Sequence, residues 1–154
     1  MGQSNLAKID KAIELQGRTR ETILSLEKSV MYQTRSSGED LNELRKRLQR
    51  SLDSIKDAFE SNCEQQLKAI TPMLGRLPTN GLILQNQEAR KELDEVRSLC
   101  THEGMDDLSR ERLETMITYI ASRTRAVCER IVYSTSAQET ILEITKKALH
   151  QEVR

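Results

Sequence analysis

The sequence predicts an all-α fold, an elongated antiparallel helical bundle or coiled coil of about four helices. Of its 154 residues, 31% are charged and only 3% are aromatic, and the chain has 6 Gly and 2 Pro. A β domain would need more turn residues and more aromatic strand residues. Apolar residues recur instead every three or four positions, which is the spacing of one helix face. We find no linker or internal repeat, so residues 1–154 are expected to form a single helical domain.

The first helix is predicted over residues 5–33, and its apolar stripe is interrupted in the middle. Gln16, Gly17 and Arg20 stand where core residues would be expected. Gly17 also lowers helix stability by about 1 kcal/mol relative to Ala. The sequence therefore predicts an amphipathic but loosely specified helix here.

The second helix is predicted over residues 39–75 and begins at a capping box, formed either by Ser36 with Glu39 or by Ser37 with Asp40. Its apolar stripe covers 33 residues in nine steps, a mean spacing of 3.67. This eleven-residue repeat predicts a nearly straight helix with a slight right-handed drift. The stripe consists of Leu41, Leu44, Leu48, Leu52, Ile55, Phe59, Cys63, Leu67, Ile70 and Leu74.

Pro72 is expected to end or kink the second helix, because proline breaks the backbone hydrogen-bond pattern. The third helix is predicted over residues 82–101, and it ends at His102-Glu103-Gly104. Its short stripe consists of Ala89, Leu93, Val96 and Cys100.

The fourth helix is predicted over residues 106–152, with Asp106 or Asp107 as its N-cap and a possible break at residues 134–136. Its core positions alternate in steps of four and three, which is the heptad pattern of coiled coils. Polar residues at such positions, notably Gln138, can select register and partner number. The seam consists of Leu113, Ile117, Ile120, Thr124, Val127, Ile131, Ser134, Gln138, Ile141, Thr145 and Ala148.

The two long stripes are candidate partner-binding surfaces. At 1.5 Å per residue, 39–71 and 106–152 would form rods of ~50 and ~70 Å, and the first and third helices are too short to cover both. We therefore expect a helical protein partner, either a second copy or a different chain, although a closed four-helix bundle would also satisfy the pattern. The predicted partner-binding residues are Leu41, Leu44, Leu48, Leu52, Ile55, Phe59, Leu113, Ile117, Ile120, Val127, Ile131, Gln138 and Ile141.

No catalytic motif, nucleotide loop or metal-ligand spacing is recognisable, so the sequence predicts no enzyme, no cofactor, no metal and no small-molecule substrate. Cys63, Cys100 and Cys128 are expected to be buried thiols, and Cys100 and His102 lack the further ligands that zinc needs. The first residues lack the apolar core of a signal peptide, which favours a reducing, cytoplasmic location. Leu6 stands where a Gly2 myristoylation signal would have Ser or Thr, so acylation of Gly2 stays open.

The charge pattern also bears on the partner. The 24 basic and 24 acidic residues are interleaved, which disfavours nucleic acid and permits at most peripheral contact with a membrane. The expected function is non-enzymatic assembly, in which the chain acts as a scaffold or adaptor that self-associates or docks as a coiled-coil subunit. The alternatives are a peripheral membrane-binding protein and an RNA-binding assembly factor. The membrane-binding protein would use an amphipathic helix or a basic face of a helical rod. The RNA-binding factor would use the densest basic patch, Arg45, Lys46, Arg47 and Arg50.

Overall fold

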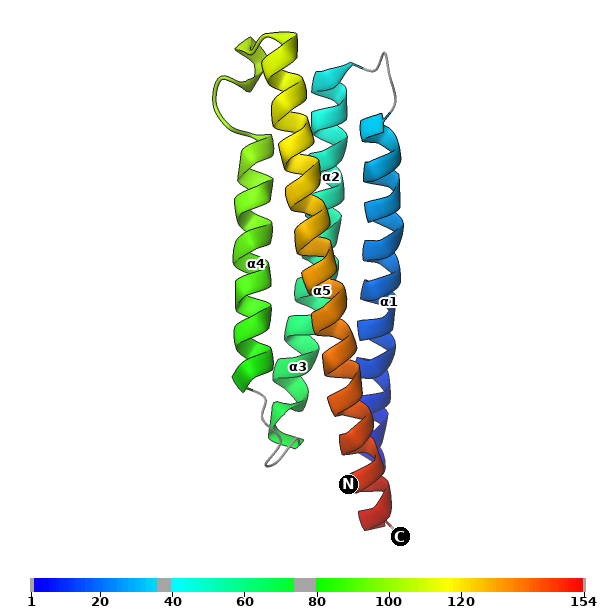
Figure 1. Cartoon of the computed structure of the whole chain (residues 1–154). Coiled ribbons are helices and arrows are strands. Elements are labelled where there is room, and N and C mark those ends of the chain that lie inside the picture. Colours follow the sequence, from blue (N-terminus) through cyan, green and yellow to red (C-terminus); the bar gives the residue numbers. More distant parts are fainter. Residues whose placement is uncertain (1, 36–39, 74–79, 154) are drawn as a thin grey trace.

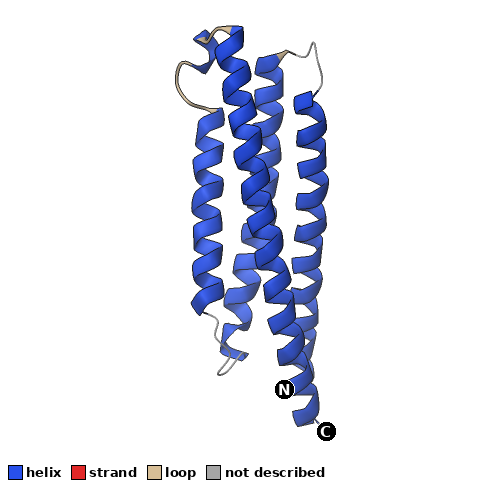
Figure 2. Cartoon of the chain, in the orientation of Figure 1, coloured by secondary structure: helices blue, strands red, loops and turns tan. Residues whose placement is uncertain are grey.

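Four long helical segments run antiparallel and side by side in the computed structural model, which describes residues 2–35, 40–73 and 80–153 (Figure 1). Every regular element in these ranges is helical, as Figure 2 shows. This arrangement confirms the predicted all-α bundle of about four helices. None of the described helices combines the length and apolar character that a bilayer span requires. The longest helices are α1 (Gly2–Arg35), α2 (Leu41–Phe59), α4 (Asn80–Cys100) and α5 (Arg110–Val153).

The second segment is not one uniform helix. After α2 the chain forms a single π-helical turn, η1 (Glu60–Glu64), in which the Gln65 amide donates to the Glu60 carbonyl five residues earlier. The α-helix resumes as α3 (Gln65–Ile70) and ends before Pro72, in a short 3-10 turn, η2 (Thr71–Met73). The prediction of a continuous, nearly straight helix is therefore wrong at residues 60–64.

The π-turn corrects the direction in which the apolar stripe faces. From Ile55 to Leu67 the stripe advances in three consecutive steps of four residues. Each such step overshoots a full α-helical turn by about 40°, so three steps would carry the stripe ~120° around the helix. The extra residue in the π-turn removes about 100° of this rotation. Leu67 and Ile70 consequently remain in the core, where both are buried.

The start of α2 is capped by a side chain. Asp40 accepts hydrogen bonds from the amides of Asn42 and Glu43, at 3.0 and 3.4 Å. Such a cap stabilises a helix by about 1 kcal/mol because it satisfies two orphan amides. The other members of the predicted capping boxes, in residues 36–39, lie outside the described residues.

The start of α5 differs from the prediction. Asp106 and Asp107 belong to a 3-10 turn, η3 (Met105–Asp107), and α5 begins at Arg110. The amide of Arg112 donates to the Ser109 hydroxyl at 3.4 Å, so Ser109 takes the capping role. α5 then continues through 134–136 without a break.

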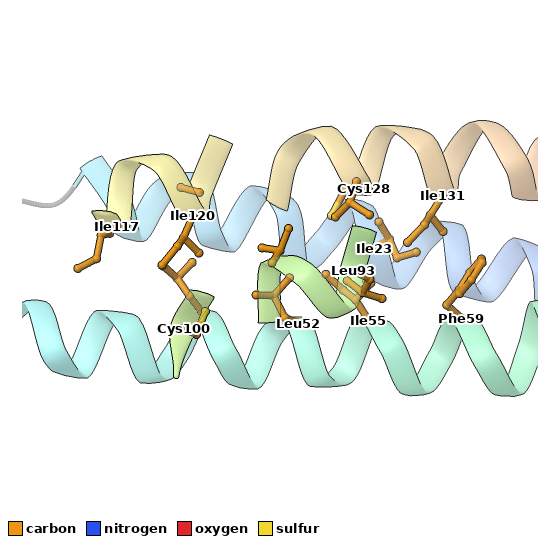
Figure 3. Packing of buried hydrophobic residues seen from close by; sticks show 14 of the residues in the cluster. Ile23, Leu52, Ile55, Phe59, Leu93, Cys100, Ile117, Ile120, Cys128 and Ile131 are labelled. Atoms are coloured by element: carbon orange, nitrogen blue, oxygen red, sulfur yellow. The ribbon is translucent and has the colours of Figure 1, made fainter. Parts of the chain in front are cut away.

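The apolar core forms two separate clusters. Figure 3 shows how side chains from α1, α2, α4 and α5 meet in the larger one, which we call the upper cluster; Phe59, Leu93 and Ile120 are among its members. It contains further residues of the same kind, including Ile23, Leu48, Leu52, Ile55, Val96, Ile117, Val127 and Ile131. The smaller one, the lower cluster, lies toward the chain termini and consists of Ile9, Ala12, Leu67, Ile70, Leu82 and Leu142.

We expect Leu52→Ala to lower the free energy of unfolding by about 2–5 kcal/mol, because removing a buried leucine loses apolar burial and leaves a cavity. Leu24→Ala is the matched control, since Leu24 is 41% exposed whereas Leu52 is fully buried. Its effect should stay within ~0.5 kcal/mol. Urea denaturation followed by circular dichroism measures both variants, and equal losses would contradict the assignment of Leu52 to the core.

Candidate protein-interaction surface

The residues predicted to bind a partner lie mainly inside the chain's own bundle. Leu52, Phe59, Ile120 and Ile131 are all fully buried by neighbours from the same chain. The premise that the stripes exceed what the chain can cover is therefore wrong for the single chain. The same holds for the buried residues Leu44, Leu48, Ile55, Leu113, Ile117, Val127 and Gln138, while Leu41 and Ile141 are half-buried.

The stripes are covered because α1 and α4 together extend along both of them. α1 extends to 34 residues and packs along α5, and α4 packs between α2 and α5. Together they cover both long stripes. Contact of any stripe residue with a partner stays a prediction, and it would require the bundle to open.

A layer of polar side chains crosses the bundle between the two apolar clusters. We call it the amide layer, and it consists of Gln16, Asn86, Ser134 and Gln138, all buried. The Gln16 amide donates to Gln138 Oε1 at 2.9 Å. Gln138 Nε2 in turn donates to Asn86 Oδ1 at 2.8 Å and to Ser134 Oγ at 3.0 Å. Three helices, α1, α4 and α5, are therefore held in one register by a directed hydrogen-bond chain.

The π-turn takes part in this layer. Gln16 Nε2 also points to the Cys63 carbonyl of η1, at 3.5 Å. Within the described residues, Gln16 Oε1 and Asn86 Nδ2 have no hydrogen-bond partner. The layer is thus unsatisfied at both of its ends, and each such atom costs about 1–3 kcal/mol when buried.

The residues that interrupt the stripe of the first helix all face α5. Gln16 belongs to the amide layer, and Arg20 forms a partly buried ion pair with Glu139. A Cβ atom at Gly17 would lie 3.2 Å from the Glu139 carboxylate, so glycine leaves room for this side chain beside Arg20. The polar residues that interrupt the apolar stripe of the first helix are therefore the residues that contact polar side chains of α5, Gln138 and Glu139.

The predicted basic patch is not a continuous cationic surface. Arg45 is buried and turned toward the end of α4, where it donates to the Cys100 carbonyl at 2.7 Å and to Asp106 at 2.6 Å. A guanidinium placed here satisfies a terminal carbonyl and opposes the negative end of the helix dipole. Lys46 and Arg50 are exposed, and Arg47 is half-buried. Arg45 therefore joins α2, α4 and the α4–α5 connection. The prediction that Arg45 contributes to an exposed basic patch is wrong.

The three cysteines are buried and unpaired, as expected. Burial raises the pKa of Cys63 and Cys128 from 9.0 to about 12, and that of Cys100 to about 11. Their thiolate fraction at neutral pH is accordingly very small, which opposes nucleophilic chemistry. In the part of the chain that the structure describes, no group of three or more His, Cys, Asp or Glu side chains is placed to hold a metal ion.

An exposed apolar row runs along the outer face of α5. Tyr119, Tyr133 and Ile144 are 47%, 71% and 50% exposed. They are separated by 14 and 11 residues, which are close to four and three full helical turns, so they share one face. Ala126, also exposed, falls between the two tyrosines on the same face. We call these four residues the outer row. It is hard to recognise in the sequence because the heptad seam dominates the pattern of α5.

Leu84 of α4 extends this surface sideways. It is 55% exposed and precedes Glu95 by eleven residues, so the two share one face of α4. Glu95 pairs with Arg123 of α5 at 3.5 Å. Because α4 and α5 are antiparallel, eleven residues back along α4 correspond to eleven residues forward along α5. The hydrogen bonds of Asn86 with Ser134 and Gln138 agree with this direction, and Leu84 therefore lies level with the part of α5 between Tyr133 and Ile144.

Comparison with known proteins returns no relative. No protein-family model matches the chain, and neither a curated protein nor a solved structure matches it.

We expect Gln138→Leu to lower the free energy of unfolding by about 1–3 kcal/mol, because Gln16 loses its acceptor and a buried donor is left unsatisfied. Gln85→Leu, at an exposed position of α4, is the matched control and should change stability by less than ~0.5 kcal/mol. Thermal and urea unfolding measure the difference. A Gln138→Leu variant as stable as the control would argue against the amide layer as a structural element.

We expect stability to fall at alkaline pH. Above about pH 9 the unfolded chain loses thiol protons that the folded chain retains. Ionisation therefore stabilises the unfolded state relative to the folded state, and the free energy of unfolding falls. The loss should continue toward about pH 12, the raised pKa of Cys63 and Cys128. Each thiol contributes up to ~1.4 kcal/mol per pH unit. Urea unfolding at about pH 8 and about pH 10 measures this effect. The loss should be smaller in Cys128→Ala, and an identical loss would contradict the assignment.

Proposed function

We propose that the chain is a non-enzymatic helical assembly or adaptor protein that docks a helical protein partner, either a second copy or a different chain. The observation that carries the proposal is the outer row of α5, with Leu84 beside it. Aligned apolar side chains on a long rigid helix suit a helix-to-helix contact. Scattered exposed apolar residues would not, because they are ordinary on protein surfaces.

The border of the outer row favours protein over other partners. On its α4 side, Arg123 and Arg130 pair with Glu95 and Glu92 of α4, at 3.5 and 3.2 Å. The Arg123 guanidinium also lies 5.8 Å from the centre of the Tyr119 ring. Cations already paired in this way attract anionic lipid or RNA weakly. An apolar strip with a neutral, ion-paired rim resembles the anatomy of a protein interface.

The size of the row limits the affinity. Complete burial of a large apolar side chain contributes ~1.5–3 kcal/mol, and the row with Leu84 offers only four such side chains. Association itself costs roughly 4–15 kcal/mol in lost freedom. A single contact should therefore be weak, and stable assemblies need several contacts made together.

We expect Tyr133→Glu to abolish concentration-dependent association, because a carboxylate on the outer row cannot be buried without a partner. Sedimentation equilibrium over a range of concentrations measures the mass. Thr118→Glu places the same charge at an exposed position of α5 outside the row and should leave association unchanged. Circular dichroism should show both variants folded, since neither side chain is buried.

Sedimentation of the purified chain detects only self-association, so binding to a different protein requires a second measurement. A photo-crosslinking amino acid at position 133 should capture a specific protein that the same group at position 118 does not. A wild-type chain that stays monomeric at all concentrations and gives no position-specific crosslink would contradict the proposed function. Leu48→Asp or Ile55→Asp would not serve, because both residues are fully buried and a charge there would unfold the bundle.

A further inference from the structure

The boundary between the two apolar clusters has a consequence for the motion of the bundle. The upper cluster contains nineteen buried residues, and the lower cluster contains six. No apolar contact network joins them through the amide layer, since they form separate clusters within the described residues. Apolar burial is the main source of cooperativity in a helical bundle, and it is interrupted at this level.

The amide layer resists opening less than an apolar layer would. Separating the helices exposes Gln16 Oε1 and Asn86 Nδ2, which have no partner in the closed bundle, to water. The remaining amide and hydroxyl groups exchange hydrogen bonds within the layer for hydrogen bonds with water, which is nearly balanced. Exposing the amide layer to water therefore costs less free energy than exposing a layer of leucines, because the polar groups form hydrogen bonds with water.

The ion pairs between helices also differ above and below the layer. Above it, α4 is tied to α2 and α5 by four pairs: Arg97–Asp53, Lys56–Asp94, Arg130–Glu92 and Arg123–Glu95. Below it, Lys146 and Asp10 join α5 to α1 at 2.8 Å, and like the upper pairs this pair is partly exposed. Exposed pairs contribute little to stability. The second helical segment changes from α2 to α3 at the level of the amide layer, through the π-turn at residues 60–64.

We propose that the half of the bundle below the amide layer opens as one cooperative unit while the upper half stays folded. The opening unit comprises the first half of α1, α3, the start of α4 and the end of α5, which together supply the lower cluster. This property belongs to the single chain and does not depend on the proposed assembly function.

Native-state hydrogen exchange on the full chain, at low protein concentration and with increasing sub-denaturing urea, tests the proposal. Amides near Ile13, Ile70 and Leu142 should exchange through one shared opening, with protection at least ~10-fold below that of amides near Leu52 and Ile120. Equal protection and equal urea dependence in the two groups would mean that the bundle opens only as a whole, and would overturn the proposal.

Two variants on the same helix separate the halves. Leu142→Ala, in the lower cluster, should accelerate exchange below the layer by about 100-fold and should accelerate the upper amides as well, because the upper amides exchange on full unfolding, which also disrupts the lower cluster. Ile131→Ala, in the upper cluster, should accelerate the upper amides and leave the lower ones unchanged. If Ile131→Ala accelerates the amides below the layer by the same factor as those above it, the two halves are one unit and the proposal fails. Because exchange is read on dilute monomer, this outcome is independent of whether Tyr133→Glu affects association.

Discussion

The inner face of α5 is the surface on which the rest of the fold depends. Its buried residues contribute to both apolar clusters and to the amide layer between them. α1 packs along this face, α4 packs beside it, and α2 lies close across the core. The hydrophobic effect supplies the attraction, while Gln138 decides which residues of α1 and α4 stand opposite one another. A helix that serves three neighbours in this way must stay continuous, which explains why α5 runs without a break through Ser134 and Thr135, both buried.

The fold was largely predictable from the sequence because periodicity records which face of a helix is buried. The stripe from Leu41 to Ile70 and the seam from Leu113 to Thr145 identify residues that are mostly buried in the structure. Helix ends were harder to predict. Several polar residues near the start of α5 could each cap it, and the choice of Ser109 depends on the path of the preceding turn. The capping residue is therefore set by tertiary geometry that a local pattern does not contain.

The candidate site was predictable only in part, for a related reason. Periodicity identifies a buried stripe but does not say whether the burying partner is the same chain. The row through Tyr119, Tyr133 and Ile144 is visible in the sequence as spacings of 14 and 11, yet it has few members beside the dense heptad seam. The sequence presented Gln16 as a gap in an apolar stripe and Arg45 as part of a basic patch, because a polar residue near an apolar face has two explanations. Only the positions of Asn86, Gln138 and the α4 terminus decide between a gap in the pattern and a buried hydrogen bond.

The π-turn makes the lower bundle unequally sensitive to the two kinds of change in chain length. A chain one residue shorter between Phe59 and Gln65 would form an uninterrupted α-helix there, because the π-turn accommodates one extra residue. Leu67 and Ile70 would then keep facing the interior. An insertion of one residue would instead rotate everything after it by about 100° and turn both side chains away from the core. Single-residue insertions in this segment are consequently more disruptive than single-residue deletions, although Glu60 is half-buried and Ser61 is exposed.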